Sequence, residues 1–122
     1  MAKFPKPIIV AYRGIAMGGG LGLSMDCPIK IADETTRMAM PEARLGMVPD
    51  VGMGYFFSRM DQAMALYMSL TGSQINGRDA KDLGWASHLI SSDSWEAFEG
   101  DLFALDLEGL KREEILEKVQ DL

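Results

Sequence analysis

The residues of this sequence that are best suited to chemistry are a cluster of glycines and two carboxylates that follow it. Four glycines stand close together in AMGGGLGLSMDC (residues 16–27). Glycines at a turn from a strand into a helix expose backbone N–H groups beside the positive end of the helix dipole. Such N–H groups can stabilise a developing oxyanion. The alternative is that the glycines only let the helix pack closely against a sheet.

The glycine run matches none of the common phosphate-binding or nucleophile motifs. A dinucleotide fingerprint needs a third glycine where this sequence has Leu23 or Met25. A P-loop needs a lysine after its last glycine, but Leu23 follows Gly22. A nucleophile elbow would need a glycine at Asp26. With one histidine and one cysteine in the chain, we expect no metal site. A role for the backbone N–H groups is what remains.

The two carboxylates, Glu42 and Asp50, lie in the apolar segment MAMPEARLGMVPDVGMGYFF (residues 38–57). An apolar environment disfavours the charged form of a carboxyl group, which suits it to general acid or base catalysis near neutral pH. Each residue also has a simpler explanation. Glu42 follows Pro41 and could only complement the start of a helix. Asp50 follows Pro49 and could only cap one.

The elements that must position these residues alternate between strands and helices, which predicts an α/β architecture. The apolar and alternating runs predict strands at residues 8–14, 29–33, 37–40 and 86–90. Helix formers and capping residues predict helices at residues 61–72, 77–85, 92–105 and 110–122. Between them, we expect a helix to start within residues 18–27, a single turn to run from Pro41 to Gly46, and Asp50 to cap the next segment. The first strand has no partner before it, so we expect an incomplete sheet and a chain that is the middle of a longer protein.

Composition and charge narrow the classes of function. The chain of 122 residues amounts to one domain, and its net charge of −6 argues against binding to nucleic acid, which usually needs a basic stripe. No apolar run is long enough to span a bilayer, so we expect no membrane partner. The N-terminus has no secretory or transit-peptide pattern and the lone Cys27 fits a reducing compartment, which predicts a cytoplasmic protein. We expect Cys27 to be buried and His88 to be structural.

The segment KPIIVAYRGIAMGGGLGLSMDCPIKIADETTRMAMPEARLGMVPDVGMGYFFSRM resembles the crotonase (enoyl-CoA hydratase/isomerase) superfamily. LTGSQINGRDAKDLGWASHLI continues the family pattern, so the resemblance extends from residue 6 to about residue 90. The glycine run, Pro-Glu and Pro-Asp-Val-Gly at these spacings look most like the 3-hydroxyisobutyryl-CoA hydrolase branch. The resemblance implies an α/β, crotonase-like ββα spiral fold whose N-terminal half is missing. Residues 1–90 would form the central part of the core, and residues 91–122 a helical C-terminal segment.

The resemblance also implies roles for the residues of these motifs. In the oxyanion and substrate-binding run of Gly18, Gly19 and Gly20, the N–H of Gly19 would bind the thioester carbonyl oxygen of an acyl-CoA. Glu42 would be the catalytic carboxylate and would activate water or attack the thioester carbonyl itself. Asp50 would orient the substrate hydroxyl or assist proton transfer. The implied activity is hydrolysis of 3-hydroxyisobutyryl-CoA in valine catabolism, with coenzyme A as part of the substrate and no other cofactor.

Two alternatives stay open. The first is hydratase or isomerase chemistry at Glu42 with a different partner residue, although Gly22 stands where enoyl-CoA hydratases carry a second Glu. The second is an inactive chain that acts as a homo-oligomer or by pairing with a homologous chain, because a missing half would expose apolar strand edges.

Met53 stands where the hydrolase branch often has another glycine, a change that would narrow the acyl pocket.

Overall fold

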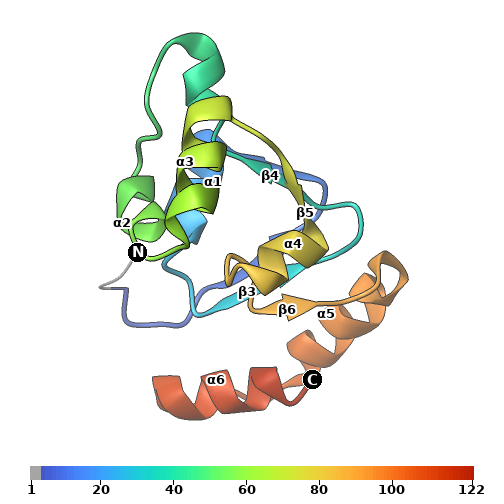
Figure 1. Ribbon diagram of the computed structural model, residues 1–122. Coiled ribbons are helices and arrows are strands. Elements are labelled where there is room, and N and C mark those ends of the chain that lie inside the picture. Colours follow the sequence, from blue (N-terminus) through green and yellow to red (C-terminus); the bar gives the residue numbers. More distant parts are fainter. Residues whose placement is uncertain (1–3) are drawn as a thin grey trace.

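A computed structural model describes residues 4–122 as two small β-sheets with helices packed around them (Figure 1). The strands of the first sheet are all parallel and have the order β1 (Ile9–Tyr12), β3 (Ile29–Ala32) and β6 (His88–Leu89). The second sheet has the order β2 (Ile15–Met17), β4 (Arg37–Ala39) and β5 (Ile75–Asn76). In this sheet β2 and β4 are parallel, and β5 is antiparallel to β4.

Residues 4–122 form six α-helices and two short 3₁₀ helices. The α-helices are α1 (Gly18–Ser24), α2 (Met53–Phe57), α3 (Gln62–Thr71), α4 (Gly77–Asp82), α5 (Trp95–Ala104) and α6 (Arg112–Gln120). The 3₁₀ helices are η1 (Pro41–Leu45) and η2 (Ser92–Ser94). Of these helices, η2, α5 and α6 follow the last strand, and the others lie between strands. Within residues 4–122, no helix is long and apolar enough to cross a membrane.

The chain passes from the first sheet to the second twice, and each time a helical segment follows. After β1 it turns at Gly14, whose φ is +78°, into β2 and then α1. After β3 it turns through residues 33–36 into β4 and then η1. The predicted α/β class with a ββα order is therefore confirmed. The strand predicted at residues 8–14 forms as β1, and the left-handed Gly14 follows its end. The sequence did not predict β2, which comes directly after this turn and belongs to the second sheet.

The helix predicted at residues 61–72 forms, and local capping explains its limits. Asp61 precedes α3 and its Oδ1 accepts a hydrogen bond of 3.1 Å from the backbone N–H of Met64. Gly72 ends the helix with a φ of +60°, a left-handed conformation that glycine adopts without steric cost. The predicted cap at Asp50 is wrong. The residue that precedes α2 is Gly52, with a φ of +84°, and no side chain caps that helix.

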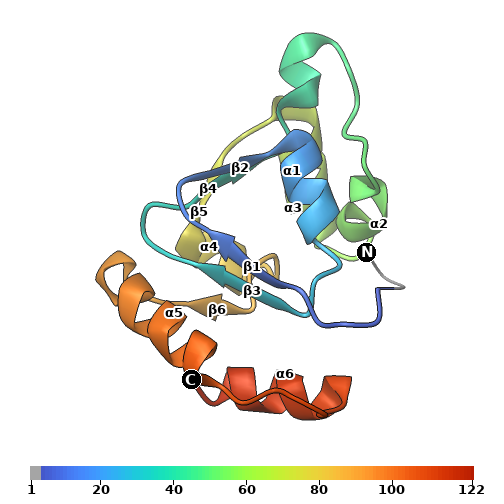
Figure 2. The same ribbon diagram turned by 180° about the vertical axis from the view of Figure 1, so that it is seen from behind.

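Apolar side chains form two clusters on opposite faces of the first sheet. Ile29 and Ile31 point from β3 into a cluster with Trp95 of α5 and Val119 of α6. Ala32 of the same strand belongs to the larger cluster, which lies under the other helices. Figure 2 shows α5 and α6 at the end of the molecule away from α1 and η1. The helix predicted at residues 110–122 forms as α6 and buries one side against the cluster that contains Trp95.

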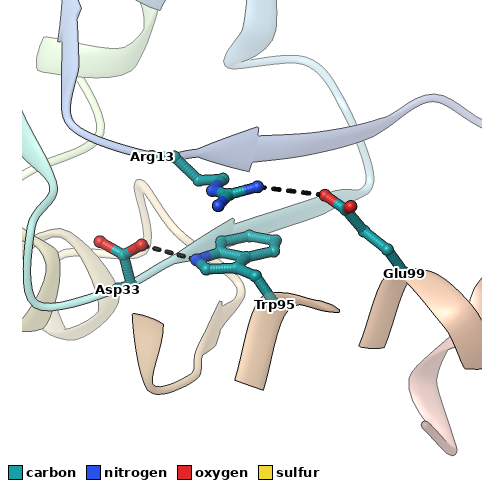
Figure 3. A network of polar contacts seen from close by, with 4 residues as sticks. All are labelled: Arg13, Asp33, Trp95 and Glu99. Carbon is teal, nitrogen blue, oxygen red and sulfur yellow. Dashed lines mark hydrogen bonds and ion pairs between the residues drawn. The ribbon is translucent and has the colours of Figure 1, made fainter. Parts of the chain in front are cut away.

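A network of polar contacts fastens α5 to the first sheet (Figure 3). The buried indole N–H of Trp95 donates a hydrogen bond of 2.6 Å to Oδ2 of Asp33, the residue that follows β3. The Arg13 guanidinium carbon lies 5.4 Å from the centre of the Trp95 ring, within the range of a cation–π interaction. Arg13 also forms an ion pair of 3.3 Å with Glu99 of α5. The network joins residues that are more than 60 positions apart in the chain.

Asp33 makes the stability of the protein depend on pH. Burial alone would raise the pKa of this carboxyl group, but hydrogen bonds from Thr35, Trp95 and Thr36 outweigh burial and lower it. A carboxyl group with a lowered folded-state pKa stabilises the protein above its unfolded-state pKa, and this contribution is lost as the pH falls through the folded-state value. We therefore expect the free energy of unfolding to decrease below about pH 4, the ordinary range for aspartate.

Urea unfolding at a series of pH values measures this effect, with Asp33→Asn as the comparison. The variant should have a flatter profile than the parent chain between about pH 4 and pH 2, because it lacks the titrating group. Equal slopes for the two proteins would contradict the assignment to Asp33.

Candidate functional site

Glu42 and the glycine run meet because two adjacent strands end at the same edge of the second sheet. β2 and β4 are parallel, and Met17 at the end of β2 is paired with Ala39 at the end of β4. Helix α1 begins directly after β2, and η1 begins two residues after β4. The start of α1 and the carboxylate on η1 are therefore neighbours, although they are 24 positions apart in the sequence.

The carboxylate of Glu42 lies against the backbone of Gly18. A Cβ atom built on Gly18 would be 3.0 Å from Oε1 of Glu42. Gly18 also has a φ of +53°, in the left-handed region that residues with side chains rarely adopt. The first glycine of the run is therefore required both by its backbone conformation and by the close approach of Glu42.

Glu42 is a buried carboxylate with an unpaired oxygen. The residue is 7% exposed, and among residues 4–122 its Oε2 is a buried side-chain atom with no hydrogen-bond partner. Leaving a buried polar atom unpaired costs free energy, so native proteins rarely do so without a functional reason. Oε2 of Glu42 therefore lacks a hydrogen-bond partner that a water molecule or a substrate could supply.

The 3₁₀ helix that carries Glu42 is fixed by the end of α3. Nε of Arg44 donates a hydrogen bond of 3.1 Å to the backbone oxygen of Thr71. A Cβ atom on Gly72 would be 3.1 Å from Cα of Pro41, so the two backbones pack closely. Gly46 closes η1 with a φ of +74°, as the sequence predicted. This packing holds η1 against the end of α3.

Gly19 and Gly20 lie at the open end of α1. Both are exposed, and nothing lies within 4 Å of the position that a Cβ atom would take on either residue. Met17 precedes the helix, and no side chain caps its start. Since the N–H groups in the first turn of a helix have no acceptor within the helix, those of Gly19 and Gly20 can donate to a ligand beside Glu42.

Asp50 lies apart from this arrangement, in the exposed loop between η1 and α2. Its backbone oxygen accepts a hydrogen bond of 2.9 Å from the N–H of Met53. In the part of the chain that the structure describes, no hydrogen bond joins its side chain to Glu42 or to the glycine run. The structure thus brings Glu42 together with Gly18, and leaves Asp50 on the loop that runs past them.

Sequence reasoning missed a contact between α1 and this loop. A Cβ atom on Gly22 would be 2.1 Å from Cγ2 of Val51, so the Val51 side chain occupies that space. Gly18 and Gly22 are four residues apart and share one face of α1. The i, i+4 spacing of these glycines is the one feature of the sequence that indicated a face of α1 without side chains. Nothing in the sequence around Val51 indicated which residue packs there.

The histidine and the cysteine of the chain lie on other segments than Glu42. His88 is in β6, and Cys27 lies between α1 and β3. Nδ1 of His88 lies 2.8 Å from Oγ of Ser87, and burial followed by the charge of Lys81 lowers the pKa of the imidazole. Burial raises the pKa of the Cys27 thiol, which is buried as expected. Within residues 4–122, no three histidine, cysteine or acidic side chains are placed to hold a metal ion.

The close approach at Gly18 predicts opposite effects for two glycine-to-alanine substitutions in α1. Gly18→Ala forces a side chain into a left-handed conformation against Glu42, and should destabilise the protein by about 1–3 kcal/mol. Gly20→Ala adds a methyl group in open space and should stabilise it by about 0.5–1 kcal/mol, because alanine favours the helix. Urea unfolding of both variants tests this, and equal effects would contradict the packing described.

The sequence profile of the enoyl-CoA hydratase/isomerase family matches residues 1–122. Among solved structures, the carnitinyl-CoA dehydratase of Mycobacterium thermoresistibile superimposes with a TM-score of 0.81 and 32% identity, over 98% of this chain and 33% of that one. An enoyl-CoA hydratase of Rhodobacter sphaeroides superimposes with a TM-score of 0.74 and 31% identity, over 99% of this chain and 38% of that one.

Among curated proteins, the mitochondrial 3-hydroxyisobutyryl-CoA hydrolase of Danio rerio is 42% identical over 105 residues, which are 86% of this chain and 28% of the relative. The Homo sapiens enzyme of the same name is 41% identical over 100 residues, which are 82% of this chain and 26% of the relative. The chain thus spans little more than a quarter of the length of these relatives. Both are named mitochondrial, which contradicts the cytoplasmic location expected from the sequence.

Proposed function

Because this chain belongs to the enoyl-CoA hydratase/isomerase family, we propose that it takes a coenzyme A thioester as its substrate. We further propose that the reaction is hydrolysis and that the acyl group is a 3-hydroxyacyl group such as 3-hydroxyisobutyryl. The hydrolase names of relatives about 40% identical to the chain support this choice. Coenzyme A is part of the substrate, and the proposal involves no other cofactor.

The unpaired, buried Oε2 of Glu42 is the observation that carries the proposal. A carboxylate with a free oxygen can accept a proton from water, which then attacks the thioester carbon, or it can attack that carbon itself. In the first route the carbon–sulfur bond breaks, and the proton that Glu42 took from water passes to the departing sulfur. In the second route an anhydride of Glu42 and the acyl group forms as the carbon–sulfur bond breaks. Water then hydrolyses the anhydride, which restores the carboxylate and supplies the proton of the thiol. The products are the free 3-hydroxy acid and coenzyme A.

The N–H of Gly19 is proposed to stabilise the negative charge that develops on the thioester oxygen. Its position at the uncapped start of α1, beside the residue that contacts Glu42, supports this role. Gly18 and Gly20 complete the backbone surface on which the acyl group would lie. Donors already oriented toward a developing oxyanion stabilise the transition state more than the ground state.

Asp50 is proposed to bind the hydroxyl group of the substrate or to assist proton transfer. Its exposure on the loop beside α1 supports a role toward a ligand rather than in the core.

The packing at Gly22 favours hydrolysis over addition of water to a double bond. The Val51 side chain fills the space next to Gly22, so this face of α1 carries no second carboxylate beside Glu42. Water addition by a pair of carboxylates would lack one partner there.

Release of free thiol from 3-hydroxyisobutyryl-CoA by the purified chain tests the proposal. We expect thiol to appear at a rate proportional to the concentration of the chain. Crotonyl-CoA serves as the second substrate, and loss of its enoyl absorbance without thiol release would support hydratase chemistry instead. Absence of thiol release would overturn the proposal for this chain.

A further inference from the structure

Val51 has a backbone conformation that a valine rarely adopts. Its φ is +44°, in the left-handed region, where a β-branched side chain is a clear outlier. Such a conformation persists only where the surrounding structure enforces it, and it occurs preferentially near functional sites. Within residues 4–122, Val51 is the one residue other than glycine with a positive φ.

Gly22 is the residue that accommodates Val51. A Cβ atom on Gly22 would be 2.1 Å from Cγ2 of Val51, 2.7 Å from its Cβ and 2.9 Å from its backbone oxygen. Both the side chain and the backbone of Val51 therefore lie directly against α1. The Cβ direction of Gly18, one turn earlier on the same helix face, points at Glu42. One side-chain-free face of α1 thus contacts Glu42 at its start and Val51 one turn later.

The chain between these two contacts makes little use of its apolar side chains for packing. Leu45, Met47 and Val48 are 71%, 55% and 78% exposed. Figures 1 and 2 show this segment passing from η1, at one end of the molecule, along α1 to α2. A loop with exposed apolar residues has few contacts that fix its position. The contact of Val51 with Gly22 anchors the end of this loop that leads into α2. Asp50 is the residue directly before Val51.

We propose that Val51 is a positioning residue that fixes Asp50 relative to Glu42 and the start of α1. The proposal rests on the role assigned to Asp50 in the proposed function. Packing of the Val51 side chain into the space left by Gly22 holds residue 51 in its left-handed conformation. That conformation sets the direction of the chain on both sides of residue 51. It therefore also sets the position of the Asp50 carboxylate, one residue earlier.

Val51→Gly tests the proposal, because glycine adopts the same φ without strain and lacks the anchoring side chain. Glycine also adds backbone freedom, which the control Val48→Gly adds in the same loop. We expect faster hydrogen exchange at the backbone N–H groups of Met47, which donates to the backbone oxygen of Glu42, and of Met53, which donates to that of Asp50. We also expect kcat for thiol release to fall by about 10–100-fold with a smaller change in KM, since a small misplacement of a reacting group has effects of this size. Val48→Gly is the matched control in the same loop, and should leave hydrogen exchange at Met53 unchanged.

Combination with Asp50→Asn separates positioning from a general loss of stability. If Val51 acts through Asp50, Val51→Gly should lower kcat no further in a chain that already carries Asp50→Asn. Multiplied effects of the two substitutions, or a parent-like kcat in Val51→Gly, would overturn the proposal. Gly22→Ala disrupts the same contact from the α1 side, because its methyl group would collide with Val51. It should also speed hydrogen exchange in the loop.

The hydrogen-exchange measurement distinguishes this proposal from the proposed function. It needs no substrate, so unchanged exchange in both Val51→Gly and Gly22→Ala overturns the anchor even if the chain hydrolyses thioesters. A parent chain that releases no thiol overturns the proposed function even if the loop is loosened as expected.

Discussion

Glu42→Gln is expected to lower the rate of thiol release from 3-hydroxyisobutyryl-CoA by about 10²–10⁴-fold, the range that general acid–base catalysis contributes. Glutamine has nearly the same shape as glutamate, so it fills the same space against Gly18. Its amide, however, cannot accept a proton at neutral pH or attack the thioester as a carboxylate does. The loss should therefore appear in kcat, with little change in folding.

Glu117→Gln is the matched control for this substitution. Glu117 lies exposed on α6, in the helical segment at the end of the molecule away from η1. The same chemical change there should leave thiol release at the parent rate. Circular dichroism and urea unfolding of both variants check that each is folded. Equal rates for Glu42→Gln and Glu117→Gln would contradict a catalytic role for Glu42.

Trp95→Ala is expected to reduce the free energy of unfolding by about 3–5 kcal/mol, the usual range for removing a large aromatic side chain from a core. Trp95 is 2% exposed and packs with Ile29, Ile31 and Val119 between the first sheet and the C-terminal helices. The substitution removes this packing, the hydrogen bond to Asp33 and the ring beneath the Arg13 guanidinium. Urea unfolding measures the sum of these losses.

Trp95→Phe separates the polar part of the effect from the packing. Phenylalanine keeps an aromatic ring in the core but leaves Oδ2 of Asp33 without its indole donor. An unpaired buried acceptor costs about 1–3 kcal/mol, so this variant should lie between the parent chain and Trp95→Ala. Phe103→Ala on the same helix is the control, because Phe103 is 84% exposed and should change stability little. A Trp95→Ala protein as stable as Phe103→Ala would contradict this account of the C-terminal helices.

The short strands show why some elements could not be predicted from the sequence. β2 has three residues and β5 has two, which is too few to display the alternation that identifies a strand. They exist because β4 offers hydrogen bonds on both of its sides. The turn at Gly14 was visible as a glycine, but its effect, which is to move the chain into a second sheet, depends on strands further along the chain.

Local chemistry in the sequence determined the boundaries of α3 and the turn at Pro41. The resemblance of its motifs to the enoyl-CoA hydratase/isomerase family is confirmed by the match of the family profile to the chain. Asp61 and Gly72 delimit α3 by interactions within a few residues, so no distant part of the chain was needed to predict them. The sequence also marked Glu42 and the glycine run as separate candidates for chemistry.

Only the tertiary structure decided that Glu42 meets Gly18 and that Val51, rather than another side chain, fills the space at Gly22. Parallel pairing of β2 with β4 brings the first pair together, and pairing between strands is set by long-range contacts that no local pattern specifies. The left-handed conformation of Val51 is unfavourable for the residue taken alone. It exists because α1 presents a face without side chains, and that face is available only after the chain has folded.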